Sequence, residues 1–325
     1  MAPSTVSYVL TGKRSISEGT RRRVEEAIQT LNYHPHAGAR ALASNRSNVI
    51  ALVVPLRPGM HVPVVMQFAT SVVTSARRHG HDVLLLTADE GAPGLRRVAA
   101  SSLVDGLIIM DVELHDARLP ALRRLGRPSV LIGVPERTVG LTCVDLDFVA
   151  VGAVCVDHLA DLGHREVALV GPPRAVYERE TGFAQRTVAG FTQAARRRGL
   201  DARIHPCEPA LEPVLATLTA MFRDQPGLTG LVVHNEAALS PLLDALHRLG
   251  RRVPDDVSIV AVCPDDVAER ARPPLTSVLI PAEEIGRRAV ELLVAKLNGD
   301  QSDQTSLLSP RLTERGSTAR RPRGS

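Results

Sequence analysis

Short, continuous apolar runs recur along this chain from residue 48 onward and alternate with longer stretches of helical periodicity. The first run, at residues 49–54, has no polar position, and such runs are typical of strands buried on both faces of a parallel sheet. The strings RRHGHDVLLL and ADLGHREVALV share one order: the end of a helix, a glycine, a polar pair and a buried strand. Because parallel strands need helical crossovers, this recurrence predicts an α/β fold with two similar lobes.

Individual elements follow from the same patterns. We expect strands at residues 49–54, 82–86, 104–110, 129–132, 166–170, 231–233 and 257–262. We expect helices at residues 64–79, 148–162 and 182–198, with Gly80 and Gly163 ending the first two. At 325 residues and 44% apolar composition, the chain is long enough for two well-buried lobes.

The N-terminal region is organised differently. It shows a short helix pattern at residues 3–10, a turn at Gly12, a second helix starting at Ser17, and a short third helix after Pro35. The first 46 residues hold seven basic and three acidic side chains, a balance of +4 that equals the formal net charge of the whole chain. This concentration of positive charge indicates a small N-terminal module that binds phosphate groups, attached to an electrically neutral body.

The run PSTVSYVLTGKRSISEGTRRRVEEAIQTLNYHPHAGARAL resembles the DNA-binding head and hinge helix of the lactose/galactose repressor (LacI/GalR) family. Family members have one more helix before the recognition helix, so we expect the head here to be a partial helix-turn-helix. Later strings resemble the effector-binding core of the family, which is similar to periplasmic sugar-binding proteins: VDGLIIM, HLADLGHREVALVGPP, TVAGFTQAARRRGL, LGRRVPDDVSIVAV, RPPLTSV and PRLTERGST. The resemblance therefore implies two doubly wound parallel-sheet lobes with a ligand cleft between them.

This reading divides the chain into four parts. They are a head at 1–35, a hinge helix and linker at 36–47, a core for effector binding and dimerisation at 48–320, and a basic tail at 321–325. Within the core we expect one lobe at about 48–147 plus 277–300 and the other at about 148–276 plus 301–320.

The resemblance implies that a homodimer binds a near-palindromic, double-stranded operator. Hydroxyl-bearing side chains of the recognition helix would face base edges or phosphates, basic side chains would add salt-dependent affinity, and an apolar hinge residue would wedge into the minor groove. The residues concerned are Ser4, Thr5, Ser7, Tyr8, Arg14, Arg21, Arg22, Arg40 and the wedge Leu42.

For the effector, the resemblance points to Arg186, whose planar fork suits hydroxyls or a carboxylate, and to Asn235 and Asp265 after later strands. Further candidates are His61, Tyr177 and Phe183. We expect the effector to be a sugar or related metabolite. Aromatic residues make up only 2% of the chain and Trp is absent, which leaves another small metabolite, or no effector, open.

Other function classes lack support in the sequence. There is no GxSxG, no Walker-type GxxxxGK and no GxGxxG after a strand, so we expect no enzyme and no cofactor. The four cysteines form no CxxC pair, which predicts buried free thiols and no metal site. Without a membrane-length apolar run or a signal segment, we expect a cytoplasmic protein. The alternatives are a ligand-binding core that has lost DNA binding and a solute-binding protein.

Overall fold

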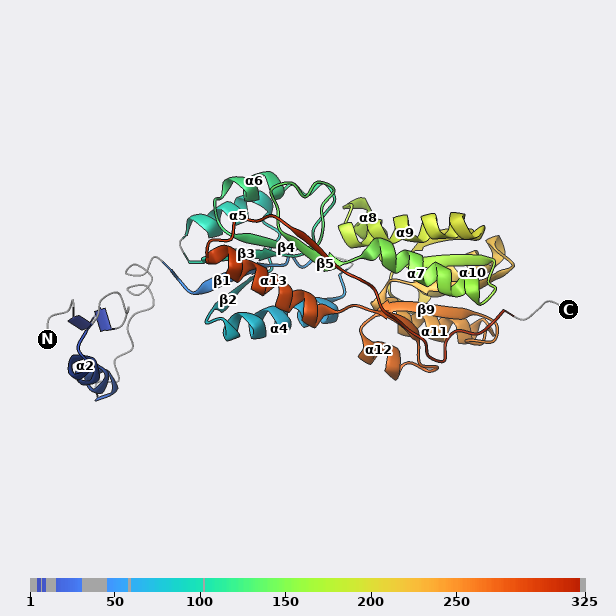
Figure 1. Ribbon diagram of the computed structural model, residues 1–325. Helices are drawn as coiled ribbons and strands as arrows, with labels where there is room; N and C mark the ends of the chain where they lie inside the picture. The colour runs from blue at the N-terminus through green and yellow to red at the C-terminus, as the bar shows by residue number, and fades with distance from the viewer. Residues whose placement is uncertain are drawn as a thin grey trace.

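The computed structural model describes residues 5, 6, 8, 9, 16–30, 46–57, 60–101 and 103–321. From residue 46 onward these residues form two α/β lobes side by side, each built on a six-stranded sheet with helices on both faces (Figure 1). The predicted fold class is confirmed, and no helix among the described residues is long and apolar enough to cross a membrane.

The sheet of the first lobe has the strand order β11-β5-β4-β3-β1-β2, and every pair in it is parallel. Its strands are β1 (Val49–Val53), β2 (Asp82–Leu86), β3 (Gly106–Ile109), β4 (Ser129–Ile132), β5 (Cys143–Leu146) and β11 (Thr305–Leu308). Its helices are α4 (Val62–Arg78), α5 (Gly91–Ala100), α6 (Leu119–Arg124) and α13 (Ala282–Leu297).

The sheet of the second lobe repeats that order as β12-β10-β9-β8-β6-β7, with only β12 antiparallel. Its strands are β6 (Glu166–Gly171), β7 (Asp201–Pro206), β8 (Leu228–Val233), β9 (Ser258–Cys263), β10 (Thr276–Leu279) and β12 (Leu312–Thr313). Its helices are α7 (Phe148–Asp161), α8 (Arg174–Glu178), α9 (Gly182–Arg198), α10 (Leu211–Asp224), the 3-10 turn η1 (Glu236–Ala238), α11 (Leu239–Arg248) and α12 (Asp265–Arg270). The matching strand orders confirm the two similar lobes that the repeated pattern predicted.

The chain crosses between the lobes three times: between β5 and α7, between β10 and α13, and between β11 and β12. The division expected from the sequence assigns residues 277–300 to the first lobe and 301–320 to the second. The structure corrects both boundaries, because β10 pairs with β9 in the second sheet and β11 pairs with β5 in the first. The predicted tail also begins too early, since the backbone N–H of Arg321 donates to the carbonyl of Leu162.

Helices α7 and α9 lie against each other on one face of the second sheet (Figure 1). Gly152 on α7 and Gly190 on α9 allow this close approach. A Cβ atom on Gly190 would overlap the backbone carbonyl of Val149, and one on Gly152 would overlap the backbone of α9. The contact fixes the N-terminal ends of both helices, which carry Phe148 and Phe183.

In the head, Thr5, Val6, Tyr8 and Val9 are helical and α2 spans Glu18–Thr30. The carbonyl of Ser17 accepts hydrogen bonds from the backbone N–H groups of Thr20 and Arg21, each at 3.0 Å, which confirms the predicted helix start. The expected hinge helix at residues 36–43 lies outside the described residues.

Candidate functional site

A cavity of about 150 Å³ lies between the two lobes, at the carboxyl ends of their parallel strands. This is the edge where doubly wound sheets bind ligands, and the volume accommodates a six-membered ring. The first lobe contributes Met60, His61, Val64, Val65, Phe68, Met110, Asp111, Val112, Ile132, Gly133 and Asp145. The second lobe and the crossovers contribute Phe148, Pro172, Val176, Arg179, Phe183, His234, Asn235, Glu236 and Ile280.

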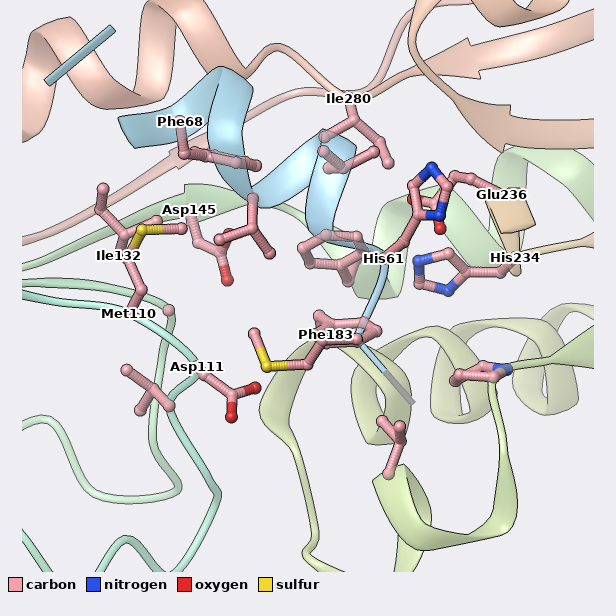
Figure 2. A pocket seen from close by; sticks show the side chains of 18 of the residues that line it. His61, Phe68, Met110, Asp111, Ile132, Asp145, Phe183, His234, Glu236 and Ile280 are labelled. Atoms are coloured by element: carbon pink, nitrogen blue, oxygen red, sulfur yellow. The ribbon is translucent and has the colours of Figure 1, made fainter. Parts of the chain in front are cut away.

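The second-lobe wall of the cavity carries an aromatic cluster of Phe148, Phe183 and His234. Figure 2 shows Phe183 and His234 on this wall. The His234 ring stacks on Phe148, with centroids 5.5 Å apart, and meets Phe183 edge-on at 5.4 Å. Burial lowers the pKa of His234 to about 4, so its ring is neutral near neutral pH and packs as an aromatic group. With Phe68 on the opposite wall, three of the five phenylalanines in the chain line this cavity. The scarce aromatic residues are therefore concentrated where a ring-shaped ligand would lie.

Burial raises the pKa of three carboxyl groups at the cavity, Asp111, Asp145 and Glu236, and the pKa values of the last two reach about 7. Asp145, the residue before the end of β5, is 6% exposed, and burial raises its pKa to about 7. The hydrogen bond from the Leu146 N–H at 2.9 Å and the charge of Arg186 offset this rise only in part. Burial likewise raises the pKa of Glu236 to about 7. Each side chain can therefore donate or accept a hydrogen bond near neutral pH. Figure 2 shows Asp145 on the first-lobe wall and Glu236 on the second-lobe side.

A third carboxylate, Asp111, is held in place by Arg57. The Arg57 guanidinium is 3.0 Å from Asp111 Oδ2 and 2.6 Å from Glu113 Oε1, and it binds Asp89 through two nitrogens. Asp111 has a φ of 52°, in the left-handed region that costs a non-glycine residue energy, so the surrounding contacts must enforce it. These contacts join the loops after β1, β2 and β3 into one rim of the cleft.

Three predicted effector residues line the cavity. His61 precedes α4, and burial lowers its pKa from 6.5. Asn235 follows β8, and its Nδ2 donates to the carbonyls of Gly171 and Cys207. Phe183 belongs to the aromatic cluster described above. Their role in binding stays a prediction.

The other three predicted effector residues do not line the cavity. The guanidinium group of Arg186 donates hydrogen bonds to the carbonyls of Val134 and Pro135 in the first lobe, so this side chain connects the two lobes. Asp265 pairs with Arg315 at 2.9 Å. Tyr177 has its hydroxyl against Gly171, and burial raises its pKa. The structure gives these three side chains other contacts than the expected ones.

Several residues that line or support the cavity were not among those predicted from the sequence. His234 directly follows the predicted strand at residues 231–233, and Glu236 comes after Asn235. Their position after the end of a parallel strand was therefore a usable signal for a binding site. Phe68 and Phe148 lie on predicted helices, where nothing in the spacing separates a core residue from a cavity residue. Arg57 stands in the proline-rich loop after β1, where only the fold brings the three carboxylates together.

Of the predicted DNA-binding residues, Thr5, Tyr8, Arg21 and Arg22 are described. Arg21 and Arg22 are exposed on α2, Tyr8 is 37% exposed and Val24 is buried, so α2 has a basic outer face and an apolar inner one. The remaining candidates lie outside the described residues: Ser4, Ser7, Arg14, Arg40 and Leu42.

Two family models match this chain. Residues 156–318, about half of the chain, match the periplasmic binding protein-like domain, and residues 2–36 match the bacterial regulatory proteins of the lacI family. The HTH-type transcriptional regulator CelR of Thermobifida fusca is 28% identical over 315 residues, which cover 94% of this chain and 91% of that protein.

Solved structures agree with these matches. A transcriptional regulator CelR–cellobiose complex aligns with a TM-score of 0.74 and 26% identity, over 98% of this chain and 96% of that one. The lac repressor dimer bound to operator and the anti-inducer ONPF aligns with a TM-score of 0.82 and 23% identity, over 97% and 95% of the two chains, and supports the fold.

Proposed function

Because this chain belongs to the LacI/GalR family of bacterial transcriptional regulators, we propose that it is a repressor that binds a specific operator under the control of a small molecule in the inter-lobe cleft. The observation that carries the proposal is a ring-sized cavity enclosed by two lobes in a chain whose N-terminal residues match a DNA-binding family model. The cleft binds the small molecule without catalysing a reaction, and the protein acts in the cytoplasm, where it binds DNA.

The lining of the cavity favours a polyhydroxylated ring as the effector. Phe148 and Phe183 offer flat apolar faces to the C–H face of such a ring, while Asp111, Asp145 and Glu236 offer oxygens to its hydroxyl groups. The likeness to a regulator solved with cellobiose supports the same class of ligand. We therefore propose a sugar or a closely related metabolite.

We also propose that the protein acts as a homodimer. Helix α4 exposes an apolar stripe of Val62, Met66 and Val73, at 45%, 38% and 49% exposure. These residues recur at helical spacing on one face, and a two-fold interface would cover this stripe on both subunits. Two heads would then meet two half-sites of a near-palindromic operator.

Selection from a pool of random duplexes tests the proposal. The full chain is incubated with the pool at low and at physiological salt, and the retained duplexes are sequenced. We expect enrichment of one near-palindromic site whose affinity falls steeply with salt, because phosphate contacts release counterions. Retention of duplexes with no shared sequence would leave only non-specific binding and would contradict the proposed function.

A further inference from the structure

At the edge of the cavity, starting from the lining residue Val112, a small set of contacts joins the two lobes directly. We call it the clasp: residues 112–115 and Glu136 of the first lobe, with residues 180–182 of the second. The Leu114 N–H donates to the Glu180 carbonyl at 2.8 Å, and the Gly182 N–H donates to the Val112 carbonyl at 2.9 Å. An antiparallel bridge between Glu113 and Thr181 connects these two bonds. The clasp therefore ties one lobe to the other through backbone.

His115 lies in the clasp between two glutamates from different lobes. Its Nδ1 is 2.7 Å from Glu180 Oε2, in the second lobe, and its Nε2 is 2.9 Å from Glu136 Oε2, in the first. Ionised carboxylates only accept hydrogen bonds, so both bonds form together only when both ring nitrogens carry protons. A neutral imidazole has one N–H and would turn a lone pair toward one of the two carboxylates. The imidazolium is therefore the form of His115 that satisfies both contacts.

We propose that His115 positions the two lobes: as an imidazolium it bridges Glu180 and Glu136 and holds the clasp closed, so the arrangement of the lobes responds to pH. Effector binding and lobe arrangement are coupled in the proposed function, so a change of pH would bias the same equilibrium as the ligand. That consequence rests on the proposed function, whereas the clasp itself does not.

The charges around His115 set the direction of the effect. The hydrogen bond to Glu180 and its charge, followed by those of Glu136, raise the pKa of His115 above 6.5. The other charged groups nearby have different partners: Glu113 binds Arg57, Asp116 binds Arg118, and Arg179 acts on Asp89 and Asp111. The pKa of His115 is higher in the folded protein than in the unfolded chain. The stabilisation of the clasp by protonated His115 is therefore complete below about pH 6.5 and is lost as pH rises through the raised pKa.

Hydrogen exchange of the clasp amides tests the proposal without DNA or ligand. Exchange at Leu114 and Gly182 is measured at pH 6 and pH 8, corrected for its intrinsic pH dependence, in the wild type, His115→Gln and the control His79→Gln. His79 is an exposed histidine of the same lobe. In the wild type and the control we expect protection to fall severalfold at pH 8, since each unit by which a pKa is raised corresponds to about a tenfold change in the equilibrium. In His115→Gln we expect no pH-dependent fall.

Glu180→Gln provides a second test, because it removes one of the two acceptor charges and should reduce the pH dependence without removing the ring. Equal loss of protection in His115→Gln and in the wild type would overturn the proposal, as would wild-type protection that does not change between the two pH values. Failure of operator selection with a normal pH response of the clasp would instead overturn only the proposed function.

Discussion

Replacement of Asp145 by Asn should stabilise the protein above neutral pH. Asp145 is 6% exposed, and burial raises its pKa from 3.8 to about 7. The folded protein therefore holds a proton that the unfolded chain releases between these two values, and stability falls as pH rises through that window. The difference between 3.8 and about 7 corresponds to about 4 kcal/mol, which is the full cost above pH 7. Asn keeps an oxygen for the Leu146 N–H and does not ionise.

Urea unfolding at a series of pH values between 4 and 8 measures this effect. The wild type should lose about 4 kcal/mol relative to Asp145→Asn between the two ends of the series, mostly above pH 5. Asp244→Asn, at an exposed position on α11, is the matched control and should follow the wild type. Parallel curves for the wild type and Asp145→Asn would refute the reasoning. A stabilised variant that also binds its effector less tightly would show why this costly carboxyl is retained.

Three further substitutions test other parts of the account. Phe183→Ala should weaken effector binding roughly tenfold by removing one aromatic wall, measured by calorimetry against Phe222→Ala on α10, and equal affinities would argue against the aromatic cluster as a binding surface. Gly190→Ala should destabilise the protein by about 1–3 kcal/mol in thermal unfolding, because α7 and α9 must separate, whereas Gly19→Ala meets nothing within 4 Å and should not; equal stabilities would contradict the close packing. Arg21→Gln should reduce the slope of log affinity against log salt by about 0.9 on the selected operator, and an unchanged slope would exclude a phosphate contact.

Much of the fold could be predicted because its signals are local. Strand β2 and helix α9 begin and end where the sequence predicts, since each is bounded by polar residues or a glycine. The predicted lobe boundaries near residues 277 and 301 were wrong because β10 and β11 are short strands next to crossovers between the lobes. The sheet that each strand joins depends on its pairing partner, which is β9 for β10 and β5 for β11.

The cavity was harder to predict than the fold. Asn235 follows a strand end, and that rule placed it at the cavity. The same rule did not place Asp265, whose carboxylate turns to Arg315. Arg186 was expected to bind the ligand because of its charge and its position in the family pattern. Its guanidinium group instead donates hydrogen bonds to the backbone carbonyls of Val134 and Pro135 in the first lobe. Side-chain direction depends on tertiary contacts that no spacing in the sequence records.

In the proposed function, a ligand in the cleft changes the affinity of the protein for DNA. The most direct measurement is the dissociation constant of the selected operator with and without a saturating carbohydrate, chosen from a panel including cellobiose as the one that raises the unfolding temperature most. We predict a change of about 5- to 150-fold, with the same factor when the ligand is titrated in the presence of operator, because coupling free energies are reciprocal. An operator affinity that stays the same while the cleft is saturated would contradict the account.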